Sequence, residues 1–109
     1  MLAQEYRLPS SQRLQNAHFR KTTLFSVKFS QNNLSVNRFG FVVRKTVDKR
    51  AVVRNRIRRV FRSCIEELLP KTVPGYDMLF FLEKGIMDKS RTEVFQKVKL
   101  LLSEEKLLQ

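Results

Sequence analysis

The chain has 109 residues, of which 42% are apolar, and a formal net charge of +12. This composition suits one domain over residues 1–109 with a single modest core, and it excludes a disordered basic tail. One cysteine, Cys64, and one histidine, His18, exclude an intramolecular disulfide and a soft-metal site. No stretch approaches the roughly 20 apolar residues that cross a bilayer, and the first residues lack a signal-peptide core. We therefore expect a soluble, cytoplasmic protein without a membrane contact.

The residues after Pro9 predict a first helix over 10–20, because a serine side chain can accept hydrogen bonds from the amides of a first helical turn. Leu14, Ala17 and His18 then recur at helical spacing. We expect this helix to precede a sheet.

Three runs predict strands. Residues 24–29 are β-rich and end in an Asn-containing turn, and residues 38–45 form a second run. We expect these two strands to pair in an antiparallel manner. After a break over 70–76 that contains Pro and Gly, residues 78–82 form an uninterrupted apolar run. This third run predicts a central strand that is buried on both faces.

Residues 51–69 predict an amphipathic helix, because apolar side chains recur every three or four positions. The apolar set is Val53, Ile57, Val60, Phe61, Cys64 and Leu68. The opposite half is almost entirely guanidinium, from Arg54, Arg56, Arg58, Arg59 and Arg62. We expect the apolar half to face the core. The like charges on the other half repel one another, and basic residues crowd the helix start, so a bound anion would relieve this face.

A last amphipathic helix is expected near the C-terminus. Ser90 and Glu93 have the spacing of a capping box. The apolar residues that follow at helical intervals are Val94, Val98, Leu101 and Leu102.

Positive charge is concentrated between Arg38 and Arg62, where ten of the 22 Lys and Arg residues occur with one of the ten acids, Asp48. A local basic field is typical of proteins that bind nucleic acid phosphates. Guanidinium groups bind phosphate through two bonds and stack on bases, which favours RNA. A merely solvated helix face is the ordinary alternative, and the near absence of acids disfavours it. Membrane binding is disfavoured because the helix lacks Trp and its apolar side is needed for the core.

Three segments in this region strongly resemble the protein subunit of bacterial ribonuclease P. They are Arg38 to Lys45 (RFGFVVRK), Lys49 to Ala51 (KRA) and Arg54 to Arg59 (RNRIRR). The resemblance extends over nearly the whole chain from Arg7. It implies an α+β fold, ribosomal S5 domain 2-like, with a small, mainly antiparallel sheet, three helices and a left-handed β-α-β crossover. Ordinary topology rules predict the opposite hand.

The resemblance also implies a function. Such a protein binds a large catalytic RNA and the 5′ leader of precursor tRNA, and it promotes endonucleolytic removal of the leader. Catalysis is then carried by the RNA, which mainly holds the Mg²⁺, and no protein side chain is catalytic. No obligate protein partner is inferred. The expected RNA-subunit contacts are Arg54, Asn55, Arg56, Arg58 and Arg59, extended by Arg62 and Lys45.

A cleft for the single-stranded leader is a further implication of the resemblance. Candidate residues, chosen as aromatic groups flanked by cations, are Phe25, Lys28, Phe29, Arg38, Phe39, Phe41 and Arg44. Strand alternation separates Phe39 and Phe41 from Arg38 and Arg44 and leaves open which face forms the cleft. In the family two Phe commonly occupy first-helix positions that correspond here to Leu14 and His18.

Two other functions remain open from the residues alone. The first is a structural RNA-binding or RNA-chaperone protein, similar to a ribosomal protein, without any reaction. The second is a DNA-binding module, which is less favoured because no helix-turn-helix precedes the basic helix and Asn55 is the only visible base-reading residue.

Overall fold

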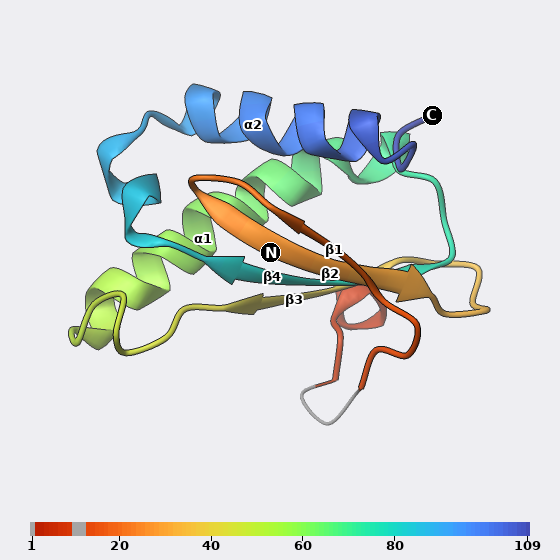
Figure 1. Cartoon of the computed structure of the whole chain (residues 1–109), viewed down its shortest axis with the longest axis horizontal. Coiled ribbons are helices and arrows are strands. Elements are labelled where there is room, and N and C mark those ends of the chain that lie inside the picture. The colour runs from red at the N-terminus through yellow and green to blue at the C-terminus, as the bar shows by residue number, and fades with distance from the viewer. Residues whose placement is uncertain (1, 10–12) are drawn as a thin grey trace.

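The computed structural model describes residues 2–9 and 13–109 (Figure 1). The strands are β1 (His18–Lys21), β2 (Phe25–Gln31), β3 (Arg38–Val42) and β4 (Tyr76–Leu82), and the α-helices are α1 (Ala51–Leu68) and α2 (Arg91–Glu104). Three short 3-10 helices are η1 (Gln4–Tyr6), η2 (Leu69–Lys71) and η3 (Lys84–Asp88). No helix within the described residues is both long and apolar enough to cross a membrane.

The four strands form a mixed sheet in the order β1-β2-β4-β3. β2 pairs antiparallel with β1 and with β4, whereas β3 pairs parallel with β4. The expected antiparallel pairing of residues 24–29 with 38–45 is therefore wrong, because the more apolar β4 lies between them. The strand expected to reach Lys45 ends at Val42. Two of the three strand pairings are antiparallel, so the sheet is mixed but mainly antiparallel, whereas the described residues form two α-helices in place of the expected three.

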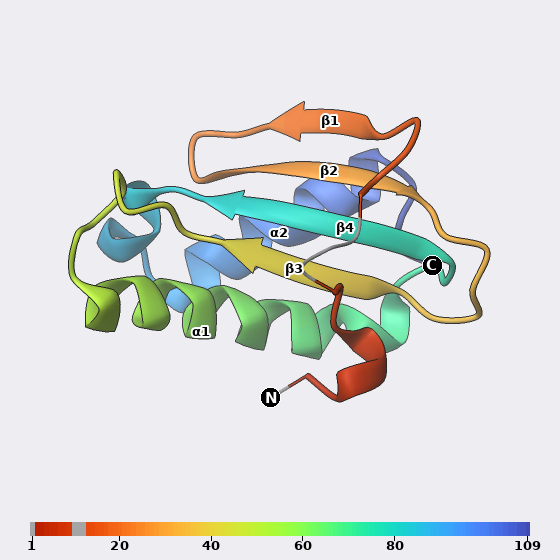
Figure 2. The same ribbon diagram turned by 90° about the horizontal axis from the view of Figure 1, so that it is seen from below.

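The connection from β3 through α1 to β4 crosses over the sheet. In Figure 1 α2 lies above the sheet, and α1 rises from the level of β3 toward α2, so in Figure 2, seen from below, α2 lies behind the sheet. α1 contacts α2 and packs on the same covered face through Phe61 and Phe80. In Figure 2 β3 and β4 both run to the left and β4 lies above β3. When the strands are turned to point upward, the chain passes behind the sheet and enters the strand to the right, which is a left-handed crossover. This hand opposes nearly all such connections and agrees with the resemblance.

The core lies between the sheet and the two helices. Phe61 of α1 contacts Phe25 of β2 and Phe80 of β4, with ring centroids 5.1 and 4.9 Å apart. All three rings are fully buried. On β4 the side chains alternate, so that Leu79 and Phe81 point to the opposite face and are half-buried. The expectation that this strand is buried on both faces therefore holds for one face only.

Both predicted amphipathic helices are confirmed. The α1 residues buried against the sheet are Val53, Ile57, Phe61, Cys64, Ile65 and Leu68. α2 begins with the predicted capping box: the Glu93 amide donates to Ser90 Oγ at 3.1 Å, and the Ser90 amide donates to Glu93 Oε1 at 3.3 Å. Its buried residues are Val94, Val98, Leu101 and Leu102, as the spacing predicted. Apolar periodicity of 3.6 therefore located both helices.

The first helix expected over residues 10–20 is wrong for the described part of that range, and residues 10–12 lie outside it. Asn16 has φ = 54°, in the left-handed region, which a regular helix does not contain. From His18 the chain is extended and pairs with β2, with Phe19 opposite Lys28. The tertiary hydrogen bonds of this edge strand outweigh the local serine signal.

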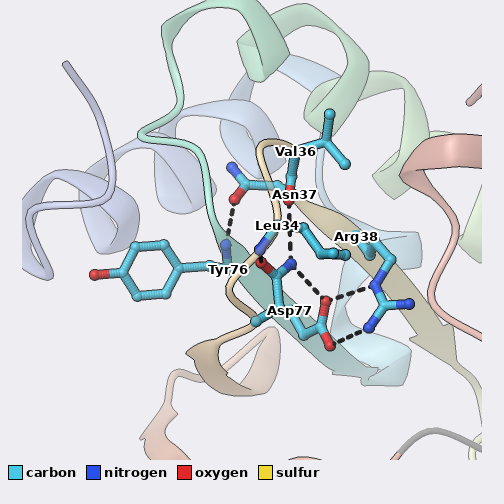
Figure 3. Close-up of polar contacts among 7 residues, drawn as sticks. Leu34, Val36, Asn37, Arg38, Tyr76 and Asp77 are labelled. Carbon is cyan, nitrogen blue, oxygen red and sulfur yellow. Dashed lines mark hydrogen bonds and ion pairs between the residues drawn. The ribbon is translucent and has the colours of Figure 1, made fainter.

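Asp77, at the start of β4, is the centre of a buried polar cluster (Figure 3). It is 3% exposed and accepts two hydrogen bonds from Arg38, Nε at 2.9 Å and Nη2 at 2.8 Å. The Asn32 side-chain amide donates to the same carboxylate at 2.9 Å, and the buried Asn37 accepts from the Tyr76 amide at 2.7 Å. This cluster fixes the loop between β2 and β3 onto the first residues of β4.

We expect Asp77→Asn to lower the free energy of unfolding by about 3 kcal/mol, because it leaves the largely buried Arg38 guanidinium without its counter-charge. Urea denaturation at neutral pH measures the loss. Asp88→Asn, at an exposed position, serves as the matched control. Equal stability of the two variants would show that the Asp77 pair contributes nothing.

Candidate nucleic-acid interface

The surface of α1 that faces away from the sheet carries the predicted arginines. Arg56 and Arg59 are exposed, and within the described residues neither side chain forms a hydrogen bond or an ion pair. Asn55 is also exposed, and its Oδ1 accepts a hydrogen bond from Arg58 Nη2. The side-chain oxygen of Asn55 thus orients the Arg58 guanidinium. The result is a row of cations on one helix, of which Arg58 is oriented by a neighbouring side chain.

The start of α1 is stabilised by Asp48, the only acid of the basic region. Its Oδ1 accepts from the Arg50 amide at 2.8 Å, and its two oxygens accept from Arg50 Nε and Nη2 at 3.0 and 2.9 Å. Arg54 Nη1 donates to the carbonyl oxygens of Asp48 and Lys49 at 3.0 and 2.8 Å. Arg54, predicted as an RNA contact, therefore also closes the loop before the helix. Lys45 and Lys49, both between β3 and α1, are exposed.

The outer face of the sheet is the face opposite the helices. One row across it consists of Phe19, Lys28, Leu79 and Gly40, and the next of Lys21, Ser26, Phe81 and Val42. Phe19 is 56% exposed. Lys28 Nζ and Arg44 Cζ lie 5.9 and 5.2 Å from the centroid of the Phe81 ring. The outer face thus combines accessible aromatic groups with cations.

Most of the aromatic residues predicted for the cleft are instead core residues. Phe25, Phe29 and Phe39 are at most 4% exposed and pack on the inner face, so they have no free ring surface for a base. Phe41 is half-buried, with its ring 5.9 Å from that of Phe61 and the Arg62 guanidinium 5.8 Å from its centroid. The sequence could not separate these residues from cleft residues because alternation does not tell which face is covered.

Arg38 is also not a free cation of the cleft. Both its Nε and Nη2 atoms bind the buried Asp77, so its role is to hold the sheet and the preceding loop together. Of the predicted cleft cations, Lys28 and Arg44 do lie on the outer face.

Phe19 and Phe81 are the outer-face aromatic groups that sequence reasoning did not select for the cleft. The available signal for Phe81 was strand alternation, because Phe80 and Phe81 must point to opposite faces. Phe19 lies within the range predicted as the first helix, so strand alternation was not applied to it. His18 is exposed and stacks on Phe29 with centroids 5.4 Å apart.

Metal-binding groups do not cluster in the described part of the chain, where no three His, Cys, Asp or Glu side chains are placed to hold an ion. Cys64 is fully buried among apolar side chains, and burial raises the pKa of its thiol. These residues do not fit a resident divalent metal ion.

Fold and surface together define an α+β protein that displays an arginine-rich crossover helix beside a partly aromatic, basic sheet face. Such a surface suits a polyanion. Residues 4–106 match the Ribonuclease P family, and the chain belongs to that family.

Curated relatives carry the same family name. A ribonuclease P protein component from Cyanothece is 36% identical over 77 residues, which cover 71% of this chain and 59% of the relative. One from Microcystis aeruginosa is 33% identical over 72 residues, covering 66% of this chain and 60% of the relative. The chain thus spans about six-tenths of the length of these two relatives.

Solved structures share the fold. The RNase P protein from Staphylococcus aureus superposes with a TM-score of 0.76 at 19% identity, covering 95% of this chain and 98% of that one. The RNase P protein from Thermotoga maritima gives 0.74 at 22% identity, covering 82% and 84%. At these identities the likeness concerns the fold alone.

We expect Asp48→Asn to lower the melting temperature at pH 7, with the difference from wild type shrinking as the pH falls below the ordinary Asp pKa of about 3.9. The Arg50 side chain and amide hold the pKa of Asp48 well below its ordinary value. The folded-state pKa lies below the unfolded one, so this stabilisation is complete above the ordinary Asp pKa of about 3.9 and declines as the pH falls below it. Thermal unfolding from pH 7 to pH 2 tests this, with Asp88→Asn as control. A difference that persists unchanged at the lowest pH would contradict it.

Proposed function

We propose that this protein is the RNA-binding component of ribonuclease P. In this proposal it binds the catalytic RNA through the outward face of α1, and it promotes removal of the 5′ leader from precursor tRNA. The RNA carries the catalysis and holds the Mg²⁺, and the complex works in the cytoplasm. Family membership supports the activity. The arginine row of α1, with Arg56 and Arg59 exposed, is the observation that carries the binding surface.

The charges on the α1 surface support an RNA partner. Repulsion between like charges on neighbouring helical turns costs a few tenths of a kcal/mol per pair. Phosphates bound between the guanidinium groups would replace this repulsion with attraction. Arg58 is held by Asn55, so part of this row is ordered before RNA arrives. Ordered donors lose less conformational entropy on binding.

The leader of the precursor is assigned to the outer face of the sheet. Phe19 offers an exposed ring, and Arg44 lies over Phe81, where its guanidinium plane extends the stacking surface. Lys28 supplies positive charge in the same area. This assignment replaces Phe25, Phe29 and Phe39, which are buried.

The reaction is tested by combining the purified protein, its cognate RNA subunit and a precursor tRNA at low Mg²⁺, each alone and together. Leader release at the mature 5′ end that is strongly stimulated by the protein is the expected result. If the protein binds the RNA tightly and never stimulates cleavage, the structural RNA-binding or RNA-chaperone function replaces this proposal. Equal affinity for duplex DNA at the same salt would instead indicate a DNA-binding module.

The double variant Arg56→Ala, Arg59→Ala is expected to weaken RNA-subunit binding at least tenfold and to reduce the slope of log affinity against log salt by about two, since each phosphate contact contributes about one. Its thermal stability should be equal or slightly raised, because like charges are removed. Titration of labelled RNA at four salt concentrations measures both quantities.

The matched control is Lys89→Ala, Lys99→Ala, which removes the same charge at two exposed positions beside and on α2. Arg54 is left intact in both variants because it also bonds the loop carbonyls. Equal losses in the two double variants would mean that net charge, and not the α1 surface, determines binding.

Phe81→Ala is expected to weaken binding of a precursor with a single-stranded leader by about tenfold relative to mature tRNA, because stacking contributes about 1–3 kcal/mol per base. Phe95→Ala is the matched control, since Phe95 is a half-buried ring with Arg91 at 5.9 Å on α2. Competition binding with the assembled complex gives the ratio. An unchanged ratio in the Phe81 variant would remove the outer face from leader binding.

A further inference from the structure

A cavity of about 350 Å³ lies where the N-terminal segment, β3 and α1 meet. Its lining residues are Leu2, Arg7, Leu8, Phe39, Gly40, Phe41 and Arg62. Its volume is within the range of roughly 300–1,000 Å³ that is usual for small-molecule sites. Its walls are apolar apart from two guanidinium groups, which come from different parts of the chain.

The first guanidinium belongs to Arg7 and is held in place by the backbone. Arg7 forms a parallel bridge with Phe39, and the next amide, that of Leu8, donates to the Phe39 carbonyl at 2.9 Å. Arg7 Nε donates to the Leu2 carbonyl at 3.1 Å. The N-terminal segment therefore continues the sheet beyond β3 and presents Arg7 at the cavity.

Gly40 permits this close approach of the N-terminal segment. A Cβ atom at this position would lie 2.8 Å from Leu79 Cδ1, so the tip of Leu79 would have to shift, and it would make a tight contact of 3.3 Å with Leu8 Cδ2. The absence of a side chain lets Leu8 lie against the strand. The wall of the cavity thus depends on a specific contact between β3 and the segment that carries Arg7.

The second guanidinium belongs to Arg62 and comes from the second half of α1. Its Cζ atom lies 5.8 Å from the centroid of the Phe41 ring. No carboxylate is among the residues that line the cavity in the described part of the chain. Two cations on one cavity without an acid raise its positive potential and favour an anion.

The combination of apolar walls and paired guanidinium groups selects a particular kind of anion. Free inorganic phosphate would leave the apolar walls wet, whereas a nucleotide covers them with its base and sugar. A base can also stack on the Arg62 plane, continuing the contact between Arg62 and Phe41. Neighbouring arginines can share the oxygens of one phosphate.

We propose that this cavity binds one unpaired nucleotide of the ribonuclease P RNA, with Arg7 and Arg62 sharing its phosphate and the base lying against the apolar wall. This inference rests on the proposed function. It adds to the α1 surface a residue, Arg7, that lies 55 positions from Arg62 in the sequence. It also gives the N-terminal segment a direct role in binding.

A double-mutant cycle tests the shared phosphate. Affinity for the RNA subunit is measured for Arg7→Ala, Arg62→Ala and both together, with Lys99→Ala as an exposed control. Each single variant is expected to lose about tenfold, as for a hydrogen bond to a charged group. The double variant should lose clearly less than the product of the two, because either change already disrupts the shared site. Full multiplicativity, or no loss for Arg7→Ala, would overturn the proposal.

Two further measurements keep the outcomes distinct. A photo-crosslinking residue at Leu8 should react with one unpaired position of the RNA subunit, and reaction confined to the precursor tRNA would overturn the assignment. The Arg56→Ala, Arg59→Ala variant is measured in parallel. If it weakens binding and Arg7→Ala does not, the cavity is wrong and the function stands; if neither weakens binding, the proposed RNA-binding function itself fails. Melting temperatures confirm that each variant is folded.

Discussion

The parallel pairing of β3 with β4 is the constraint on which the rest of the structure depends. Two parallel neighbours cannot be joined by a tight turn, so the chain must return along the full length of the sheet before it enters β4. The 18 residues of α1 provide this return. At about 1.5 Å per residue the helix is roughly 27 Å long, close to the roughly 23 Å of the seven-residue β4. The crossover thereby places one continuous helix along the sheet, with its apolar stripe inward and its arginines outward.

This arrangement combines the centre of the core and the strongest charge of the surface in a single helix. Burial of a side chain such as Phe61 contributes about 1.5–3 kcal/mol, whereas each like-charge pair on the outside costs a few tenths. The packing term is larger, so the charged face is held in position without a bound anion. Asp48 reduces the electrostatic cost at the helix start through its bonds to Arg50. The protein can therefore present an ordered cationic surface before it meets its partner.

The remaining elements extend this surface around β3. On one side of the strand lies the cavity with Arg7 and Arg62, and on the other lies the outer face with Phe81 beneath Arg44 and Lys28. Arg38 lies in the same region but does not belong to this surface. Its guanidinium pairs with the buried Asp77 and stabilises the fold. The basic residues of this segment therefore divide into structural and available groups, and the proposed RNA contacts draw on the available ones together with Arg54, which also bonds the loop.

The sequence by itself determined both helices, the capping box at Ser90 and the position of the charged face, because these follow from local periodicity and side-chain chemistry. It also carried the family resemblance through the segment from Arg38 to Arg62. Only the tertiary structure decided which strands are neighbours and which face of the sheet is covered. From local alternation alone, Phe39 and Phe81 could each face either the core or a cleft. The pairing of β3 and β2 with β4, together with the helices that cover one face, resolves the choice. The extended conformation from His18 onward likewise depends on a long-range pairing, since its hydrogen bonds are made with β2, a partner that local sequence does not specify.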